Sequence, residues 1–317
     1  ELPDLSGTTA VVTGANSGIG FETARALASH GASVTLACRN LPAAERAAEQ
    51  IRRSRRGVHL RGGHVRGADP RDSSAPGVDV RVAELDLSSL SSVRGFADAW
   101  QGPLDLLVNN AGVMTPRTWK GTPDGYELQF GTNHLGHFAL TGGLLAALQL
   151  ATSPRVVTVS SLAHHSGRAD VLDHNPPQGY QPQRAYGNSK LANLLFGAEL
   201  QRRARAHESA LTSTMAHPGV SATGLVVDRE GIGASPVVRA VAPWVMRVVF
   251  QSAAAGAKPI LYAATGAAPG SYTGPRWLRE SRGPVGPAQL SILAQDPTLA
   301  SRLWQVSQDL SGVEYHW

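Results

Sequence analysis

The fold is decided by the stretch from Thr8 to Gly20, "TTAVVTGANSGIG", in which a short apolar run meets three glycines. The run predicts a β-strand over Thr8–Thr13, and the pattern after it predicts a helix from Gly18 to about Ser29. Glycine at the turn between them permits positive φ and close packing of the helix on the strand. The stretch therefore predicts a strand, a tight turn and a helix, which together begin a βαβ unit.

Short apolar runs alternate with helical patterns along the rest of the chain. The further predicted strands are residues 33–37, 78–85, 104–108, 155–160 and 210–216. This alternation predicts parallel strands joined by crossover helices, and the near-continuous apolar strands predict a sheet that is covered on both faces. No repeat or Pro/Ser linker divides the chain. We therefore expect an α/β fold with one domain over residues 1–317, a Rossmann-type doubly wound parallel sheet of about seven strands.

Two segments depart from this alternation. Residues 54–76 are rich in Arg, Gly and Pro and lack apolar periodicity, which predicts an Arg/Gly-rich surface loop. Residues from about 220 to 250 place Val and Trp at helical spacing after a glycine-rich lead. That pattern predicts a loop and helix inserted on the substrate side, or a packed core helix.

The charge of the chain is concentrated in one place. Seven arginines and two aspartates fall between Arg52 and Asp72, and their excess equals the net charge of +5. The run has no aromatic residue and is broken by Gly, Pro and Ser, unlike an ordered face that binds nucleic acid. We expect a solvated surface and no nucleic-acid partner.

The composition also bears on membranes and on the compartment. The longest nearly uncharged apolar stretch, Ala139 to Ala151, is shorter than the roughly 20 residues that a spanning helix needs. We expect no membrane association. Cys38 is the only cysteine, so an internal disulfide is excluded. This fits a cytoplasmic protein.

The glycine turn predicts a dinucleotide site. Gly14, Gly18 and Gly20 lead into a helix N-terminus, whose N–H groups and positive dipole end favour a pyrophosphate. An acidic residue at the end of the second strand would bind the ribose of NAD, but Arg39 stands there. Arginine can pair with a 2′-phosphate, so the sequence favours NADP(H), with NAD(H) as the second candidate.

The chain resembles the short-chain dehydrogenase/reductase family. The motifs that carry the resemblance are "TGANSGIG", "LDL" around Asp86, "NNAG" at 109–112, "NHLGHF", "VSS" ending at Ser161, "YGNSK" and "HPG" at 217–219. Within the family, "LACRN", "NHLGHF", "VSSLAHH" and "SKLANLLF" are most similar to the retinol-dehydrogenase-like branch. This branch shares much with light-dependent protochlorophyllide reductases. The Arg-rich segment is longer than is usual in the family.

The glycine turn and the resemblance together imply the contacts of the cofactor. The residues expected to contact the dinucleotide are Gly14, Asn16, Ser17, Gly18, Ile19, Gly20, Arg39, Asp86, Leu87, Asn109, Ala111, Gly112, Tyr186, Lys190, Pro218, Gly219, Ser221 and Thr223.

Four residues are expected to carry the chemistry. Tyr186 and Lys190 are four apart on a predicted helix and so share one face. A nearby ammonium lowers the pKa of a tyrosine, which would make Tyr186 a general acid/base near neutral pH. Ser161 would hydrogen-bond the substrate oxygen; adjacent strand residues point to opposite faces, and the family pattern selects it over Ser160. The resemblance assigns Asn133 to a water-mediated proton relay with Lys190.

Two pairs of histidines invite a different interpretation. His134 with His137, and His164 with His165, have no cysteine partner and no recognisable set of ligands, so we expect no metal. We expect these histidines instead to be hydrogen-bonded in the protein interior, or, for the second pair, to form part of a pocket wall.

The sequence thus predicts an NADP(H)-dependent oxidoreductase that interconverts an alcohol and a ketone or aldehyde on an apolar small molecule. Whether it forms a homo-oligomer is left open. Two alternatives remain, a reductase of a conjugated double bond and a non-catalytic NADPH-binding sensor or scaffold. Intact Asn133, Ser161, Tyr186 and Lys190 argue against the sensor.

Overall fold

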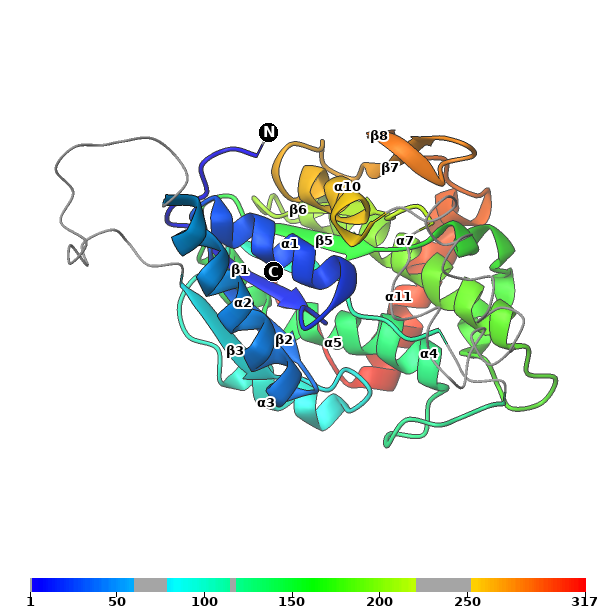
Figure 1. Cartoon of the computed structure of the whole chain (residues 1–317). Coiled ribbons are helices and arrows are strands. Elements are labelled where there is room, and N and C mark those ends of the chain that lie inside the picture. Colours follow the sequence, from blue (N-terminus) through cyan, green and yellow to red (C-terminus); the bar gives the residue numbers. More distant parts are fainter. Residues whose placement is uncertain (1, 60–78, 115–117, 221–251) are drawn as a thin grey trace, which may run out of the picture.

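A computed structural model describes residues 2–59, 79–114, 118–220 and 252–317, and these form one sheet flanked by helices (Figure 1). The strands are β1 (Thr9–Thr13), β2 (Ser33–Cys38), β3 (Val80–Glu84), β4 (Leu106–Asn109), β5 (Arg155–Val159), β6 (Thr212–Ala216), β7 (Tyr272–Trp277) and β8 (Arg282–Pro287). Their order in the sheet is β3-β2-β1-β4-β5-β6-β7-β8. The strands pair in parallel except β7 with β8.

The predicted doubly wound parallel sheet is confirmed; the described sheet has eight strands, where about seven were expected. The six apolar runs identified in the sequence all form strands. The two remaining strands, "YTGPRW" and "RGPVGP", contain Gly, Pro and Arg in place of an apolar run. Such residues are tolerated at the edge of a sheet, where β8 pairs only with β7.

Helices cover both faces of the sheet. The longer ones are α1 (Gly18–Ser29), α2 (Leu41–His59), α3 (Leu90–Asp98), α5 (Gly136–Gly143), α7 (Pro182–Ala206), α10 (Ala253–Thr265) and α11 (Pro297–Ser311). The short ones are α4 (Leu128–Phe130), η1 (Gly131–Leu135), α6 (Leu145–Gln149), η2 (Leu162–Ser166), η3 (Ala169–Asp173) and η5 (Leu293–Gln295). The helix predicted from Gly18 to about Ser29 is confirmed at both ends.

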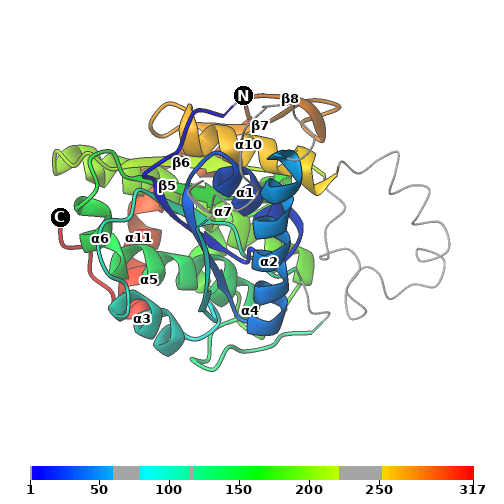
Figure 2. The same cartoon turned by 60° about the vertical axis from the view of Figure 1, so that its left-hand side comes forward.

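The two layers follow from the alternation of side chains along each strand. In β1, Val12 packs into a core built with α1, α2 and α10. Its neighbour Val11 packs into a second core on the opposite face, built with α3, α5, α7 and α11. Figures 1 and 2 show these helices on the two sides of the sheet.

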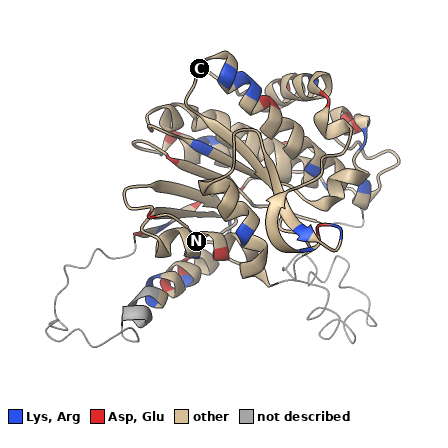
Figure 3. Cartoon of the chain, turned by 90° about the horizontal axis from the view of Figure 1, so that it is seen from above, with Lys and Arg blue, Asp and Glu red and all other residues tan. Residues whose placement is uncertain are grey.

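The Arg-rich segment begins later than the sequence suggested. A loop was predicted from residue 54, but α2 continues through His59. Arg53 hydrogen-bonds Glu49 one turn earlier. Such a pair between residues four apart stabilises a helix. Figure 3 shows arginine and acidic residues side by side on α2. Residues 60–78, and the predicted insertion beyond Val220, lie outside the described residues.

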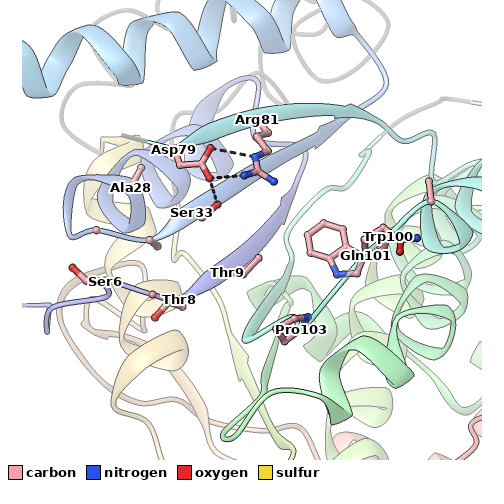
Figure 4. A pocket seen from close by; sticks show the side chains of 14 residues that line it. Ser6, Thr8, Thr9, Ala28, Ser33, Asp79, Arg81, Trp100, Gln101 and Pro103 are labelled. Carbon is pink, nitrogen blue, oxygen red and sulfur yellow. Dashed lines mark hydrogen bonds and ion pairs between the residues drawn. The ribbon is translucent and has the colours of Figure 1, made fainter. Parts of the chain in front are cut away.

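No described helix has both the length and the apolar character needed to cross a membrane. A cavity of about 700 Å³ opens at the edge where β1 to β3 begin (Figure 4). Its lining includes Trp100 and the ion pair of Asp79 with Arg81. This edge is opposite the carboxyl ends of the strands, where ligands bind in open parallel sheets. The cavity therefore does not mark the site that the glycine turn predicts.

Several histidines lie in the interior as neutral hydrogen-bonding groups. Burial lowers the pKa of His134 to about 3 and that of His137 to about 4. His134 Nε2 lies 2.8 Å from the hydroxyl of Ser307 in α11, and His137 Nδ1 lies 2.9 Å from the carbonyl of Asn133. The first contact fixes η1 against α11, and the second joins α5 to η1.

We predict opposite effects for two glycine-to-alanine substitutions. A Cβ at Gly136 would come within 2.3 Å of the Leu87 carbonyl oxygen, a backbone atom that cannot rotate away. Gly136→Ala should therefore lower the free energy of unfolding by about 1–3 kcal/mol. Gly95 in α3 faces open space, so Gly95→Ala should raise it by roughly 0.5–1 kcal/mol. Urea unfolding of both variants checks this, and equal effects would contradict the packing described.

We also predict that stability falls on mild acidification. His134 and His137 bind a proton near pH 6.5 when unfolded, but only near pH 3 to 4 when folded. Between those values the unfolded chain binds more protons, so the free energy of unfolding decreases as pH falls. Each histidine should contribute a loss of about 1.4 kcal/mol between roughly pH 7.5 and 5.5, a window above the range where most carboxylates titrate. Urea unfolding at the two pH values checks this; His134→Gln should show a smaller loss, and no loss in the native chain would contradict it.

Candidate active site

The predicted glycine turn lies at the carboxyl end of β1. Gly14 has a φ of +66°, and its N–H donates to the carbonyl of Ala37 at 2.9 Å. A Cβ on Gly20 would lie 2.5 Å from the Asn110 amide nitrogen and 2.6 Å from the Gly14 carbonyl oxygen. Only glycine therefore lets α1 begin so close to the turn. The side chain of Ser17, which precedes α1, caps no N–H of the helix.

Asn110, which the sequence analysis missed, ties this turn to β4. Its amide donates to the carbonyl of Thr13 at 2.8 Å. The amide of Asn109, an expected cofactor contact, instead donates to the hydroxyl of Thr141 in α5 at 3.0 Å. Adjacent residues at a strand end point in opposite directions, so only one of the two can face the turn. The strand register, which sets the direction of each side chain, was the signal that could have identified Asn110 and not Asn109 as the residue that faces the turn.

The other expected cofactor contacts near the turn also lie at the carboxyl edge. Asp86 follows β3, where its carboxylate accepts the N–H of Ser88 at 2.9 Å. Leu87 is buried. Arg39 follows β2 directly, is exposed, and has no hydrogen-bond or ion-pair partner among the described residues. Asn16 and Ile19 are half-buried at the start of α1.

Helix α7 is joined to the end of β5 by three hydrogen bonds. The hydroxyl of Ser160 donates to the carbonyl of Lys190 at 2.8 Å. The Val159 carbonyl accepts from the Asn193 amide at 3.0 Å and from Lys190 Nζ at 3.4 Å. Ser160 is used in this way, and its neighbour Ser161, which the family pattern selects, lies next to the Tyr186 hydroxyl.

The structure brings the four expected catalytic residues together. The hydroxyl of Tyr186 lies next to the side chain of Ser161. Lys190 Nζ lies 5.7 Å from the centre of the Tyr186 ring. A Cβ on Gly112 would lie 3.2 Å from Asn133 Oδ1 and 3.3 Å from Lys190 Nζ, so this glycine passes between those two side chains. Ala111, the residue before it, bonds Thr13 at 2.9 Å.

The electrostatics differ from the expectation for Tyr186. Burial raises the pKa of its phenol, and the neighbouring side chain of Ser161 opposes this only in part. The expected lowering of the Tyr186 pKa was wrong for the chain by itself, because removing the phenolate from water is the largest effect on this pKa. Burial also lowers the pKa of Lys190 to about 8, so the ammonium is largely charged at neutral pH.

Pro218 and Gly219 follow β6 at the same edge. Gly219 has a φ of +70°, and its N–H donates to His217 Nδ1 at 3.2 Å. Nε2 of His217 therefore carries the proton, and it lies 3.2 Å from a carboxylate oxygen of Glu280. Ser221 and Thr223 lie outside the described residues.

His164 supports Ser161 from behind. Its Nδ1 donates to the Ser161 carbonyl at 2.7 Å, and its Nε2 accepts the N–H of Ser291 at 3.2 Å. Burial lowers the pKa of His164 to about 4, so the ring is neutral. The exposed ring of His165 stacks on it with centroids 4.0 Å apart. The described residues contain no group of three His, Cys, Asp or Glu side chains that could hold a metal ion.

Comparison with known proteins agrees with this geometry. The family profile described as short chain dehydrogenase matches residues 8–230. Human retinol dehydrogenase 12 is 37% identical over 314 residues, which cover 98% of this chain and 88% of that protein. A crystal structure of an uncharacterised protein from Mycobacterium paratuberculosis superposes with a TM-score of 0.78 at 40% identity, covering 100% of this chain and 98% of the other.

A Shigella flexneri chain solved in complex with NADP shares the fold, with a TM-score of 0.58 at 20% identity, over 84% of this chain and 94% of that one. The site geometry, the family profile and the retinol dehydrogenase relatives all indicate the same protein family. The chain belongs to the short-chain dehydrogenase/reductase family of oxidoreductases, in the retinol-dehydrogenase-like branch.

Proposed function

We propose that this protein is an NADP(H)-dependent oxidoreductase that interconverts an apolar alcohol and its aldehyde or ketone. The observation that carries the proposal is that Tyr186, Ser161 and Lys190 lie together: the Ser161 side chain is next to the Tyr186 hydroxyl, and Lys190 Nζ is 5.7 Å from the centre of the tyrosine ring. A proton donor and an oxygen-binding hydroxyl at one point are what reduction of a carbonyl requires.

The residues present fit a dinucleotide. The N-terminus of α1 has no side-chain cap from Ser17, so its first N–H groups suit a pyrophosphate. The exposed guanidinium of Arg39 at the end of β2 suits a 2′-phosphate. The Pro218–Gly219 turn, Gly112 and the buried ammonium of Lys190 would hold the nicotinamide end. The bound cofactor supplies the hydride.

In the reduction direction, Ser161 binds the carbonyl oxygen of the substrate and Tyr186 gives that oxygen a proton. The carbonyl carbon accepts the hydride, so the C=O double bond becomes a C–H and an O–H bond. Tyr186 is then a phenolate, which the ammonium of Lys190 stabilises. Asn133 and Lys190 return a proton from water to the tyrosine. Oxidation of the alcohol reverses each step.

The retinol dehydrogenase relatives support an apolar substrate with one alcohol or aldehyde group. A screen of NADPH consumption tests this with all-trans-retinal, 4-nitrobenzaldehyde, an aliphatic ketone and an enone. Turnover of the carbonyls is expected. Turnover of the enone alone would favour the reductase of a conjugated double bond.

Tyr186→Phe should abolish most of the activity. The change removes the proton donor and keeps the ring, so turnover should fall by roughly 100-fold to 10,000-fold while the Kd for NADPH barely changes. Tyr180→Phe is the matched control, because the Tyr180 hydroxyl bonds the Glu127 carboxylate and should affect stability but not turnover. Stopped-flow NADPH oxidation measures both variants. A Tyr186→Phe variant that keeps most of the native rate would remove the assignment.

Arg39→Ala should weaken NADPH much more than NADH. A charge-assisted hydrogen bond to the 2′-phosphate contributes roughly 1.5–3 kcal/mol, and NADH has no such group. Arg94→Ala, which removes another exposed arginine on α3, should leave both affinities unchanged. Fluorescence titration gives the four dissociation constants. Equal affinity of the native protein for both cofactors would refute the proposed preference.

A further inference from the structure

The hydroxyl of Thr13, at the end of β1, is a fully used hydrogen-bonding group. Its oxygen accepts the N–H groups of Asn110 and Ala111, both at 2.9 Å. These two bonds occupy both lone pairs of the oxygen. Its one hydrogen must therefore be donated, and His137 Nε2 at 2.9 Å is a nearer acceptor than the Val108 carbonyl at 3.3 Å.

This arrangement fixes the tautomer of His137. Because Nε2 accepts from Thr13, the proton of the neutral ring is on Nδ1. Nδ1 lies 2.9 Å from the carbonyl oxygen of Asn133, which can only accept. His137 therefore takes a hydrogen bond from the cofactor turn and gives one to the backbone of Asn133. The ring is 1% exposed, so no bulk water replaces either partner.

The side chain of Asn133 has no hydrogen left to give. Its Oδ1 accepts the Val113 N–H at 2.7 Å, and its amide donates to the Val113 carbonyl at 3.0 Å and to Ser189 Oγ at 2.9 Å. Ser189 Oγ donates in turn to the carbonyl of Tyr186 at 2.8 Å. The group of Asn133 left for a proton relay is its backbone carbonyl, whose oxygen lies 2.9 Å from His137 Nδ1.

We propose that His137 is a positioning residue: it holds the Asn133 carbonyl, and through Ser189 the Tyr186 turn of α7, at a fixed distance from the cofactor turn. The proposal rests on the proposed function, because the proton path to Tyr186 is what it positions. The chain of hydrogen bonds runs from Asn110 and Ala111 through Thr13, His137, Asn133 and Ser189 to Tyr186.

His134 provides a matched control on the same segment. It is equally buried, and its Nε2 contacts Ser307 in α11. It stands outside the chain of hydrogen bonds that reaches Tyr186. If both histidines act only by filling the core, replacing either one should have the same effect.

Three variants separate positioning from packing. His137→Phe keeps an aromatic ring but removes the donor and the acceptor, so kcat on the carbonyl probes should fall by about 10-fold to 100-fold. His137→Gln restores one donor and one acceptor separated by one carbon, as in imidazole, and should recover most of that loss. His134→Phe should lower the Tm but keep kcat within about 3-fold, with the Kd for NADPH little changed in all three.

The solvent deuterium isotope effect on NADPH oxidation is the second readout. If proton delivery to Tyr186 becomes slow in His137→Phe, the effect should increase in that variant and stay unchanged in His134→Phe. Equal kcat losses and equal isotope effects in the two phenylalanine variants would overturn the proposal.

A third measurement needs no substrate. Nitrogen-15 NMR of the histidine ring should find the proton of His137 on Nδ1 at neutral pH, and Thr13→Val should perturb that signal but not the signal of His134. A proton on Nε2 would overturn the proposal. A chain that turns over none of the carbonyl probes would instead contradict the proposed function, and the NMR result would still decide how His137 is bonded.

Discussion

The site depends on one buried charge, the ammonium of Lys190. Its side chain is 4% exposed, and among the described contacts it has one hydrogen bond, to the carbonyl of Val159 at 3.4 Å. Burying an ammonium with so little compensation is unfavourable, which is why burial lowers its pKa to about 8. The surrounding structure must hold it there. The bonds from Ser160 to Lys190 and from Asn193 to Val159 do so by fastening α7 to the end of β5.

The histidines around the site are neutral, and this neutrality is linked to the burial of the Lys190 ammonium. A second positive charge near Lys190 would make its burial harder, and the ammonium in turn lowers the pKa of His137. His137, His164 and His217 each use one ring nitrogen as an acceptor, from Thr13, Ser291 and Gly219 respectively. These acceptor roles require neutral rings. The hydrogen bonds that shape the site therefore also keep further charge out of it.

Much of this structure could be predicted from the sequence, where local pattern and tertiary packing agree. The apolar strands and the helix after Gly18 are examples, because both faces of a parallel sheet are buried. Strands β7 and β8 escaped prediction because they contain Gly, Pro and Arg in place of an apolar run. The end of α2 was misplaced because the residues from Ser54 onward are rich in Arg and lack an apolar pattern, yet the helix continues through His59. Contacts that depend on direction, such as Asn110 over Asn109, need the register of the sheet.

The pKa of Tyr186 shows most clearly where sequence reasoning stops. The spacing to Lys190 was right, and the two side chains do share one face of α7. The sign of the shift depends on how deeply the phenol is buried, and no spacing reveals that depth. Tyr186 is 8% exposed, so desolvation is the largest effect on its pKa, and the phenol stays protonated in the chain alone. A protonated Tyr186 is the form that the proposed carbonyl reduction needs. Alcohol oxidation needs the phenolate, and it is there that the positive charge of an oxidised nicotinamide would act together with Lys190.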